Sequence, residues 1–208
     1  VWCHIAIVRI SGTTQVYLDG VQKLSFSDSY DYDSGEYISI GARNTGSGFD
    51  QYFEGRAEDI RVTKGLGIYT GAFTKPTSAL TTTWSANPFG GSNTEANSDS
   101  SKVKLLLHGD GASFTDSSSD SPANNTAHTI SVTGAYHSQA HGGIAPAMTF
   151  PANLKKTGSA GAYFDGNGDS LTVVQGVIPT GSSARTFEAW VHLTGIDSGD
   201  YQYVWKMG

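Results

Sequence analysis

The sequence contains a single cysteine, Cys3, in 208 residues. One cysteine excludes an intrachain disulfide and any zinc site built from cysteine ligands. Charged residues are also scarce, at 15%, and the net charge of −6 argues against a protein that binds the phosphate backbone of a nucleic acid. No apolar run reaches the length of a membrane span. We therefore expect neither a nucleic-acid partner nor insertion into a membrane.

The chain is rich instead in glycine, with 26 residues, and in aromatic side chains, which make up 11% of the sequence. This composition favours turns and strands over helices. No window has a sustained helical period, whereas several short segments have the alternating or β-branched patterns of strands. Asp19-Gly20 separates two such segments and predicts a two-residue type I′ hairpin turn. The expected fold class is all-β, as an antiparallel sandwich.

The first of three segments, residues 1–76, has the pattern of a β meander. Over residues 53–62, Ile60 and Val62 carry the apolar side, and Glu54, Arg56 and Glu58 can share the solvated one. This alternation predicts a strand with one solvated face.

Residues 77–101 lack any period and end in a Ser/Asn/Asp-rich stretch, so we expect a linker or a long excursion. Its aromatic residues, Trp84 and Phe89, are suited to pin it to a neighbouring surface. Residues 102–208 resume the strand patterns, and the turn sequence at 165–168 predicts a second hairpin.

Several motifs carry a family resemblance. They are Trp2-x-His4-Ile5-Ala6-Ile7-Val8-Arg9, Val16-Tyr17-Leu18-Asp19-Gly20, Phe53-x-Gly55, Asp59-Ile60-Arg61-Val62, Tyr69-Thr70, Phe73-Thr74-x-Pro76, Phe164-Asp165-Gly166-x-Gly168-Asp169-x-Leu171 and Phe187-Glu188-Ala189-Trp190-Val191. They resemble laminin G-like domains, which are members of the concanavalin A-like jelly rolls. Residues 1–76 are similar to the closing half of such a domain and residues 102–208 to its opening half. The closing half is similar to versions found in structural proteins of tailed phages and marine microbes.

The resemblance implies an antiparallel jelly-roll sandwich built from two complementary half-domains, in the reverse of the family's order. A half jelly roll buries too little apolar surface to be stable alone. Either the halves complete one another, as in a circular permutant, or each pairs with a partner outside the sequence, as in a tandem array. The strand-like pattern that already includes Val1 and the abrupt end at 206–208 slightly favour the array, as part of a longer protein.

Catalytic motifs are absent from the sequence. Glycoside hydrolases of this fold carry Glu-x-Asp-x-Glu on one strand, and none of the five glutamates lies in that pattern. Glu54 and Glu58 come nearest, but four residues of strand span roughly 13 Å, beyond the ~5–9.5 Å of hydrolase carboxylate pairs. We interpret them as part of a solvated strand face. No serine-nucleophile elbow and no nucleotide-binding loop occurs, so we expect no enzymatic activity.

Calcium is the ion that the acidic loops favour, because it binds several oxygen ligands in tight, glycine-containing loops. Asp165, Asn167 and Asp169 match the first three ligand positions of an EF-hand loop, although the rest of that motif is missing and a hairpin turn is the favoured interpretation. Asp31 and Asp33 form a second candidate.

Sugar recognition is the other chemistry to consider, because sugar rings stack on aromatic faces while carboxylates and amides bond their hydroxyls. The loop residues with this mixture are Asp28, Tyr30, Tyr32, Phe49, Asp50, Gln51 and Tyr52. Aromatic residues on strands, such as Tyr17 and Trp190, are better assigned to the core.

These observations predict a non-catalytic laminin G-like module of an extracellular or virion-surface structural protein, such as a phage fibre, tail or capsid appendage. Its expected roles are adhesion, glycan contact or assembly. Its expected partners are other copies or neighbouring domains of the same assembly, together with a cell-surface glycan. Two alternatives stay open: a soluble calcium-dependent lectin, and the carbohydrate-binding portion of a larger glycoside hydrolase.

Overall fold

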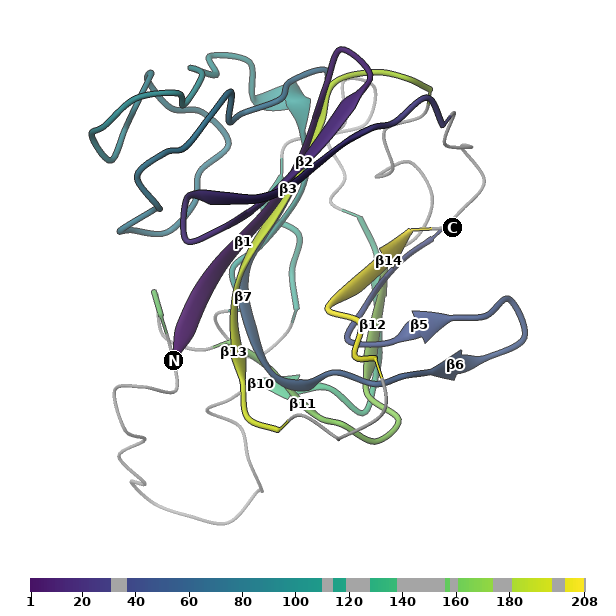
Figure 1. Cartoon of the computed structure of the whole chain (residues 1–208). Helices are drawn as coiled ribbons and strands as arrows, with labels where there is room; N and C mark the ends of the chain where they lie inside the picture. Colours follow the sequence, from purple (N-terminus) through teal and green to yellow (C-terminus); the bar gives the residue numbers. More distant parts are fainter. Residues whose placement is uncertain are drawn as a thin grey trace.

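A computed structural model describes residues 1–30, 37–109, 114–118, 128–137, 156–157, 161–173, 181–195 and 201–207. Over these residues the chain forms two facing antiparallel sheets, and its one short helical element is a 3-10 turn at Ser100–Lys102 (Figure 1). The expected all-β antiparallel sandwich is confirmed. No helix in the described ranges has the length and hydropathy that a bilayer crossing requires.

The large sheet has eight strands. They are β1 (Trp2–Ile10), β2 (Thr13–Leu18), β3 (Val21–Ser27), β7 (Glu54–Lys64), β8 (Val103–Leu107), β10 (Tyr136–His137), β11 (Ala162–Asp165) and β13 (Arg185–Leu193). Their order is β10-β11-β7-β13-β1-β2-β3, and β8 also pairs with β7. β11 lies against the first part of β7 and β8 against the second part.

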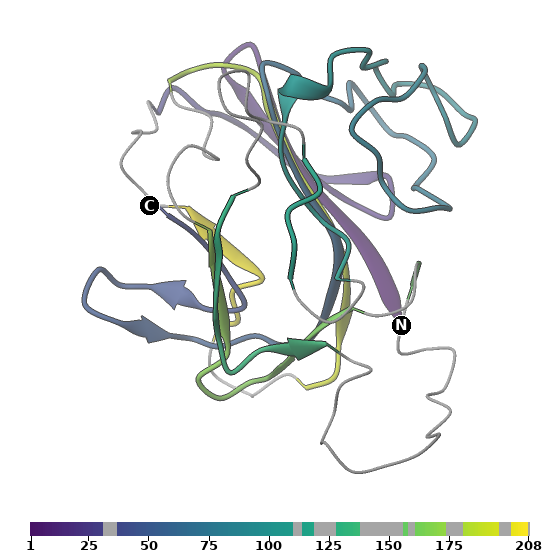
Figure 2. The same cartoon turned by 180° about the vertical axis from the view of Figure 1, so that it is seen from behind.

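The small sheet has the order β14-β4-β12-β9. Its strands are β4 (Ile38–Ile40), β9 (Ile130–Thr133), β12 (Ser170–Val173) and β14 (Trp205–Met207). A separate two-stranded hairpin, β5 (Arg43–Asn44) and β6 (Phe49–Asp50), follows β4. Figures 1 and 2 both show this hairpin projecting from the sandwich beside the small sheet.

Strands from the two ends of the chain pair in both sheets. β1 pairs with β13 from Trp2 opposite His192 to Arg9 opposite Arg185. β13 pairs on its other side with β7, and β4 lies between β12 and β14 in the small sheet. The segments 1–76 and 102–208 thus contribute neighbouring strands to the same two sheets.

The main core fills the space between the sheets. Its fully buried members include Ile40, Phe53, Val62, Leu105, Phe164, Leu171, Ala189 and Val191. Ile60 and Val62 face this core, as expected of the apolar side of the strand, and Cys3 packs against it as a partly buried thiol. Of the strand aromatics assigned to the core, Tyr17 and Trp190 are 0% exposed.

Two turns test the hairpin predictions with different results. Asp19 and Gly20 have φ angles of +50° and +79° and join β2 to β3, so the predicted hairpin is confirmed. The turn at 165–168 is not a hairpin, because β11 pairs with β7 in the large sheet whereas β12 pairs with β4 and β9 in the small one. This turn carries the chain from one sheet to the other.

Residues 66–101, called the excursion below, cover the face of the large sheet that points away from the small sheet (Figure 2). Short bridges join Tyr69 to Thr94 and Trp84 to Asn97 within it. Its buried side chains form a second apolar cluster with outward-facing residues of the large sheet. That cluster contains Ala6, Val8, Tyr17, Ile68, Tyr69 and Phe73. Residues 77–101 are therefore part of a packed excursion.

Candidate functional site

The predicted sugar-binding residues lie in two separate places. Asp28 and Tyr30 follow β3, where Arg9 donates to both backbone carbonyls at 2.7 and 2.8 Å. The Asp28 carboxylate accepts from the Thr14 hydroxyl at 2.6 Å and from the Tyr30 N–H at 3.1 Å. Burial opposes its ionisation, but these bonds and the Arg9 charge hold the pKa of Asp28 below its usual value. Its oxygens are engaged inside the protein, whereas Tyr30 is 67% exposed.

Phe49 and Asp50 form β6 of the β5–β6 hairpin, which projects away from β2 and β3 (Figure 1), and Gln51 and Tyr52 directly follow β6. Arg43 binds Asp50 through two hydrogen bonds of 2.6 and 2.5 Å. The Tyr52 hydroxyl donates to the Phe49 carbonyl at 2.9 Å. These contacts stabilise the hairpin itself, and the structure does not bring it together with Asp28 and Tyr30. Tyr32 lies outside the described residues.

The candidate calcium ligands Asp165, Asn167 and Asp169 close the turn between the sheets. The Asn167 N–H donates to the Asp165 carboxylate at 2.8 Å, and the Asp165 N–H donates to Asp169 at 2.6 Å. Burial, with the nearby charge of Asp165, raises the pKa of Asp169. No group of three or more acidic, histidine or cysteine side chains in the described parts of the chain is arranged to hold a metal. Asp31 and Asp33 lie outside those parts.

Glu58, expected on a solvated face, is fully buried, which corrects that expectation, and the neighbouring Asp59 is fully buried as well. Glu58 accepts from the backbone N–H groups of Lys156 and Thr157 at 2.8–2.9 Å. Asp59, at a φ of +48°, accepts from the Thr157 hydroxyl at 2.9 Å and contacts His108 Nδ1 at 2.6 Å. Local alternation missed this because the covering segment is about a hundred residues away in the sequence.

A buried polar network centred on Glu188 lies on the covered face of the large sheet. Arg61 binds one carboxylate oxygen of Glu188 through Nε at 2.8 Å and a terminal nitrogen at 2.6 Å. The other oxygen accepts from the Tyr69 hydroxyl at 2.6 Å and lies 3.1 Å from His4 Nε2. All four side chains are 4% exposed or less.

The electrostatics of this network favour an ionised glutamate. Burial alone would raise the pKa of Glu188, but the Arg61 charge and the hydrogen bonds from His4 and Tyr69 outweigh it and lower the value to about 2. Burial and the Glu188 charge raise the pKa of Tyr69 well above its usual value, so that tyrosine stays a neutral donor. The ionised Glu188 carboxylate therefore compensates the positive charge of Arg61.

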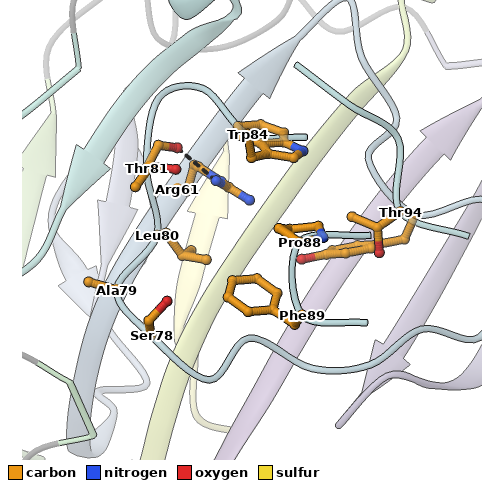
Figure 3. A pocket seen from close by; sticks show the side chains of 10 residues that line it. Arg61, Ser78, Ala79, Leu80, Thr81, Trp84, Pro88, Phe89 and Thr94 are labelled. Carbon is orange, nitrogen blue, oxygen red and sulfur yellow. Dashed lines mark hydrogen bonds between the residues drawn. The ribbon is translucent and has the colours of Figure 1, made fainter. Parts of the chain in front are cut away.

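A pocket of about 170 Å³ opens directly beside Arg61, between the sheet and the excursion (Figure 3). Apolar walls come from Tyr69, Leu80, Trp84, Pro88 and Phe89. Polar groups come from Arg61, Ser78, Thr81 and Thr94. Figure 3 shows Trp84 above Arg61 and Phe89 facing the same space from the opposite side.

The pocket wall is fixed by hydrogen bonds within the excursion. Trp84 and Asn97 exchange two backbone bonds of 2.8 and 2.9 Å, and Trp84 Nε1 donates to the Glu95 carbonyl at 2.6 Å. The Arg61 guanidinium lies 4.0 Å from the centre of the Trp84 ring and donates to the Thr81 carbonyl at 2.8 Å. The pocket therefore has a rigid floor and one braced aromatic wall.

This arrangement is suited to binding rather than to proton transfer. None of the residues that line the pocket is Asp, Glu, His or Cys, and the one charged group, Arg61, is compensated by Glu188. Aromatic walls with hydroxyl groups at the rim match a small ring that has both apolar faces and polar edges. The signal in the sequence is the pair of aromatic residues, Trp84 and Phe89, in an otherwise polar segment.

Comparison with known proteins identifies a family match for the first part of the chain. Residues 1–66 match the laminin G family model described as the concanavalin A-like lectin/glucanases superfamily. The matched part runs from β1 through β7, so the resemblance to a laminin G-like, concanavalin A-like domain is confirmed. No curated protein and no solved structure matches the chain.

Proposed function

We propose that the chain is a non-catalytic binding module of an extracellular or virion-surface structural protein, and that it contacts a glycan. Such a module, as in a phage fibre, tail or capsid appendage, would serve adhesion or assembly by presenting a binding pocket on a rigid sandwich. The observation that carries the proposal is the pocket beside Arg61, with Trp84 and Phe89 on its walls and three hydroxyl side chains around it.

Two further observations support a binding role. The buried glutamates of the large sheet are engaged: Glu188 binds Arg61, and Glu58 binds backbone N–H groups of another segment. A general acid or base needs access to its substrate, which these carboxylates lack. The similarity of the closing-half motifs to those of phage and marine microbial structural proteins supports the surface context.

The test is glycan-array binding of the purified chain with and without a chelator, combined with its molar mass in solution. We expect binding to a restricted set of glycans that the chelator does not abolish. Loss of binding on chelation would favour the calcium-dependent lectin instead. Absence of binding to every glycan would contradict glycan contact, and a regular oligomer in that case would favour a purely structural role in assembly. Hydrolysis of a bound glycan would contradict the non-catalytic assignment.

A further inference from the structure

The pocket beside Arg61 has room for one ring only. Its volume of about 170 Å³ is well below the roughly 300–1,000 Å³ of pockets that enclose drug-sized ligands. Tyr69 and Leu80, which line the pocket, are 2% exposed and belong to packed apolar clusters. The pocket therefore cannot widen for a larger group without disturbing the fold. A ligand would insert a single terminal unit and leave the rest in solvent.

The lining indicates the polarity of that unit. Phe89 and Pro88 offer apolar surface from the excursion, opposite the Trp84 and Arg61 side (Figure 3). The hydroxyls of Ser78 and Thr94 make no hydrogen bond within the described residues, so they are available to a ligand. Arg61 lines the same space, with donors directed to Glu188 and to the Thr81 carbonyl. A ring with apolar faces and several hydroxyls satisfies both kinds of surface.

Glu188 determines which ligand charge the pocket favours. Its carboxylate binds Arg61 at 2.6 and 2.8 Å in a fully buried setting, so the guanidinium beside the pocket has little net positive charge. An anionic ligand would gain little attraction from Arg61 and would be repelled by Glu188 behind it. The lining also has no carboxylate to hold a cation between protein and ligand.

We propose that this pocket binds one uncharged sugar ring without a metal ion, and that Glu188 sets the preference for uncharged rings by neutralising Arg61. The inference rests on the proposed glycan-binding function and adds the location, the ligand's charge and the residue that determines it. Glu188 acts through Arg61 and is a specificity-determining residue that does not itself line the pocket.

The location is tested by calorimetric titration with methyl glycosides of neutral hexoses. Phe89→Ala removes an excursion side chain that lines the pocket, and we expect affinity to fall about tenfold or more. The matched control is Phe26→Ala, because Phe26 is 52% exposed on β3 and belongs to neither the pocket nor the excursion. Its affinity should equal that of the unaltered chain. Equal losses in both variants would overturn the proposal.

The charge preference is tested first on the unaltered chain, with methyl hexosides against the matching methyl hexuronides. We expect the neutral ligand to bind about tenfold more tightly, with no change on adding a chelator. Glu188→Gln keeps the shape and the acceptor but releases the Arg61 charge, and it should reduce this ratio about tenfold. A thermal unfolding curve establishes that the variant is folded. If the Glu188→Gln variant is unfolded, the charge preference is decided on the unaltered chain, from its affinities for the two ligands and from the effect of the chelator.

The outcomes separate this inference from the proposed function. Glycan binding that Phe89→Ala leaves unchanged would overturn the pocket while the binding module stands. Preference for hexuronides, loss of binding on chelation, or an unchanged ratio in a folded Glu188→Gln variant would each overturn the assignment of charge. Absence of binding to any glycan on the array and to any methyl glycoside would overturn both proposals.

Discussion

Glu188 connects three strands that are distant in the sequence through one side chain. Its cross-strand neighbours are Ala6 on β1 and Arg61 on β7, and its carboxylate also engages His4 and Tyr69. A buried charge of this kind is tolerated only when a partner charge and hydrogen bonds replace water. The same contacts that stabilise the buried Glu188 carboxylate also determine how much net positive charge Arg61 contributes beside the pocket.

The lowered pKa of Glu188 predicts a loss of stability in acid. Its pKa is about 2 in the folded chain and 4.5 in an unperturbed glutamate, so the unfolded chain binds the proton first as pH falls. The contribution is complete above pH 4.5 and is lost between 4.5 and about 2, at roughly 3 kcal/mol in total. Urea unfolding at pH values from 2 to 6 measures it.

Glu188→Gln is the control for this titration, because a glutamine cannot ionise. We expect the variant to be less stable than the unaltered chain at pH 6 and the two stabilities to converge near pH 2. Parallel pH profiles would contradict the assignment and show that other carboxylates carry the acid dependence.

Residue-scale prediction from the sequence succeeded where neighbours in the chain determine the environment. The inward direction of Ile60 and Val62 follows from their apolar character, and the structure confirms it. Glu58, two residues before Ile60, does not share their face because the pairing of β7 with β13 shifts register at Asp59. Glu58 was expected on a solvated face but is buried. The backbone of Lys156 and Thr157 covers it, and no local sequence pattern encodes that contact. The network around Glu188 was missed for the same reason.

At the scale of elements, the excursion is attached to the β2–β3 turn. The Phe73 N–H donates to the Gly20 carbonyl at 3.0 Å, and Lys75 pairs with Asp19 at 3.1 Å. Gly20 has a φ of +79°, and a Cβ added there would lie 2.0 Å from the Phe73 carbonyl oxygen. Two requirements therefore select glycine at this turn: a left-handed backbone and close approach of a second chain segment.

Gly20→Ala is expected to destabilise the chain more than the strain of its φ angle alone. Gly46→Ala is the matched control, since Gly46 has a φ of +84° and no heavy atom within 4 Å of an added Cβ. A left-handed alanine costs roughly 1–2 kcal/mol, and we expect about that loss at Gly46. The loss at Gly20 should be larger, because the Phe73 backbone must move. Equal changes in urea midpoint would contradict a tight contact between turn and excursion.

The sequence predicts where turns occur, but it does not predict which strands pair on either side of a turn. The dipeptide Asp19-Gly20 is sufficient to define a hairpin because both flanking strands are adjacent in sequence. Residues 165–168 carry an equally strong turn signal, but which strands pair after the turn depends on β4, β7 and β9 elsewhere in the chain. The two residues that carry the pocket signal, Trp84 and Phe89, were recognised as anchors, while the pocket itself needs Arg61 from β7.

At the scale of the whole molecule, each sheet is built from both ends of the chain. β13 is the centre of this arrangement, because it pairs with β1 on one side and β7 on the other and is buried over most of its length. Neither end can form the large sheet without the other. The resemblance to two half-domains indicates this complementarity, but only the register shows that both halves belong to one sandwich.

A chain divided at the exposed Gly90–Gly91 linkage tests that dependence. Fragments 1–90 and 91–208 each lack the strands that cover their apolar faces, so we expect neither to unfold cooperatively alone. Mixed together, they should form a 1:1 complex with the circular dichroism spectrum and a cooperative transition like those of the intact chain, because β1 and β7 regain β13 and β4 regains β12. A fragment that melted cooperatively alone would contradict the shared sandwich. Failure of the mixture to restore the transition, with both fragments soluble, would contradict it as well.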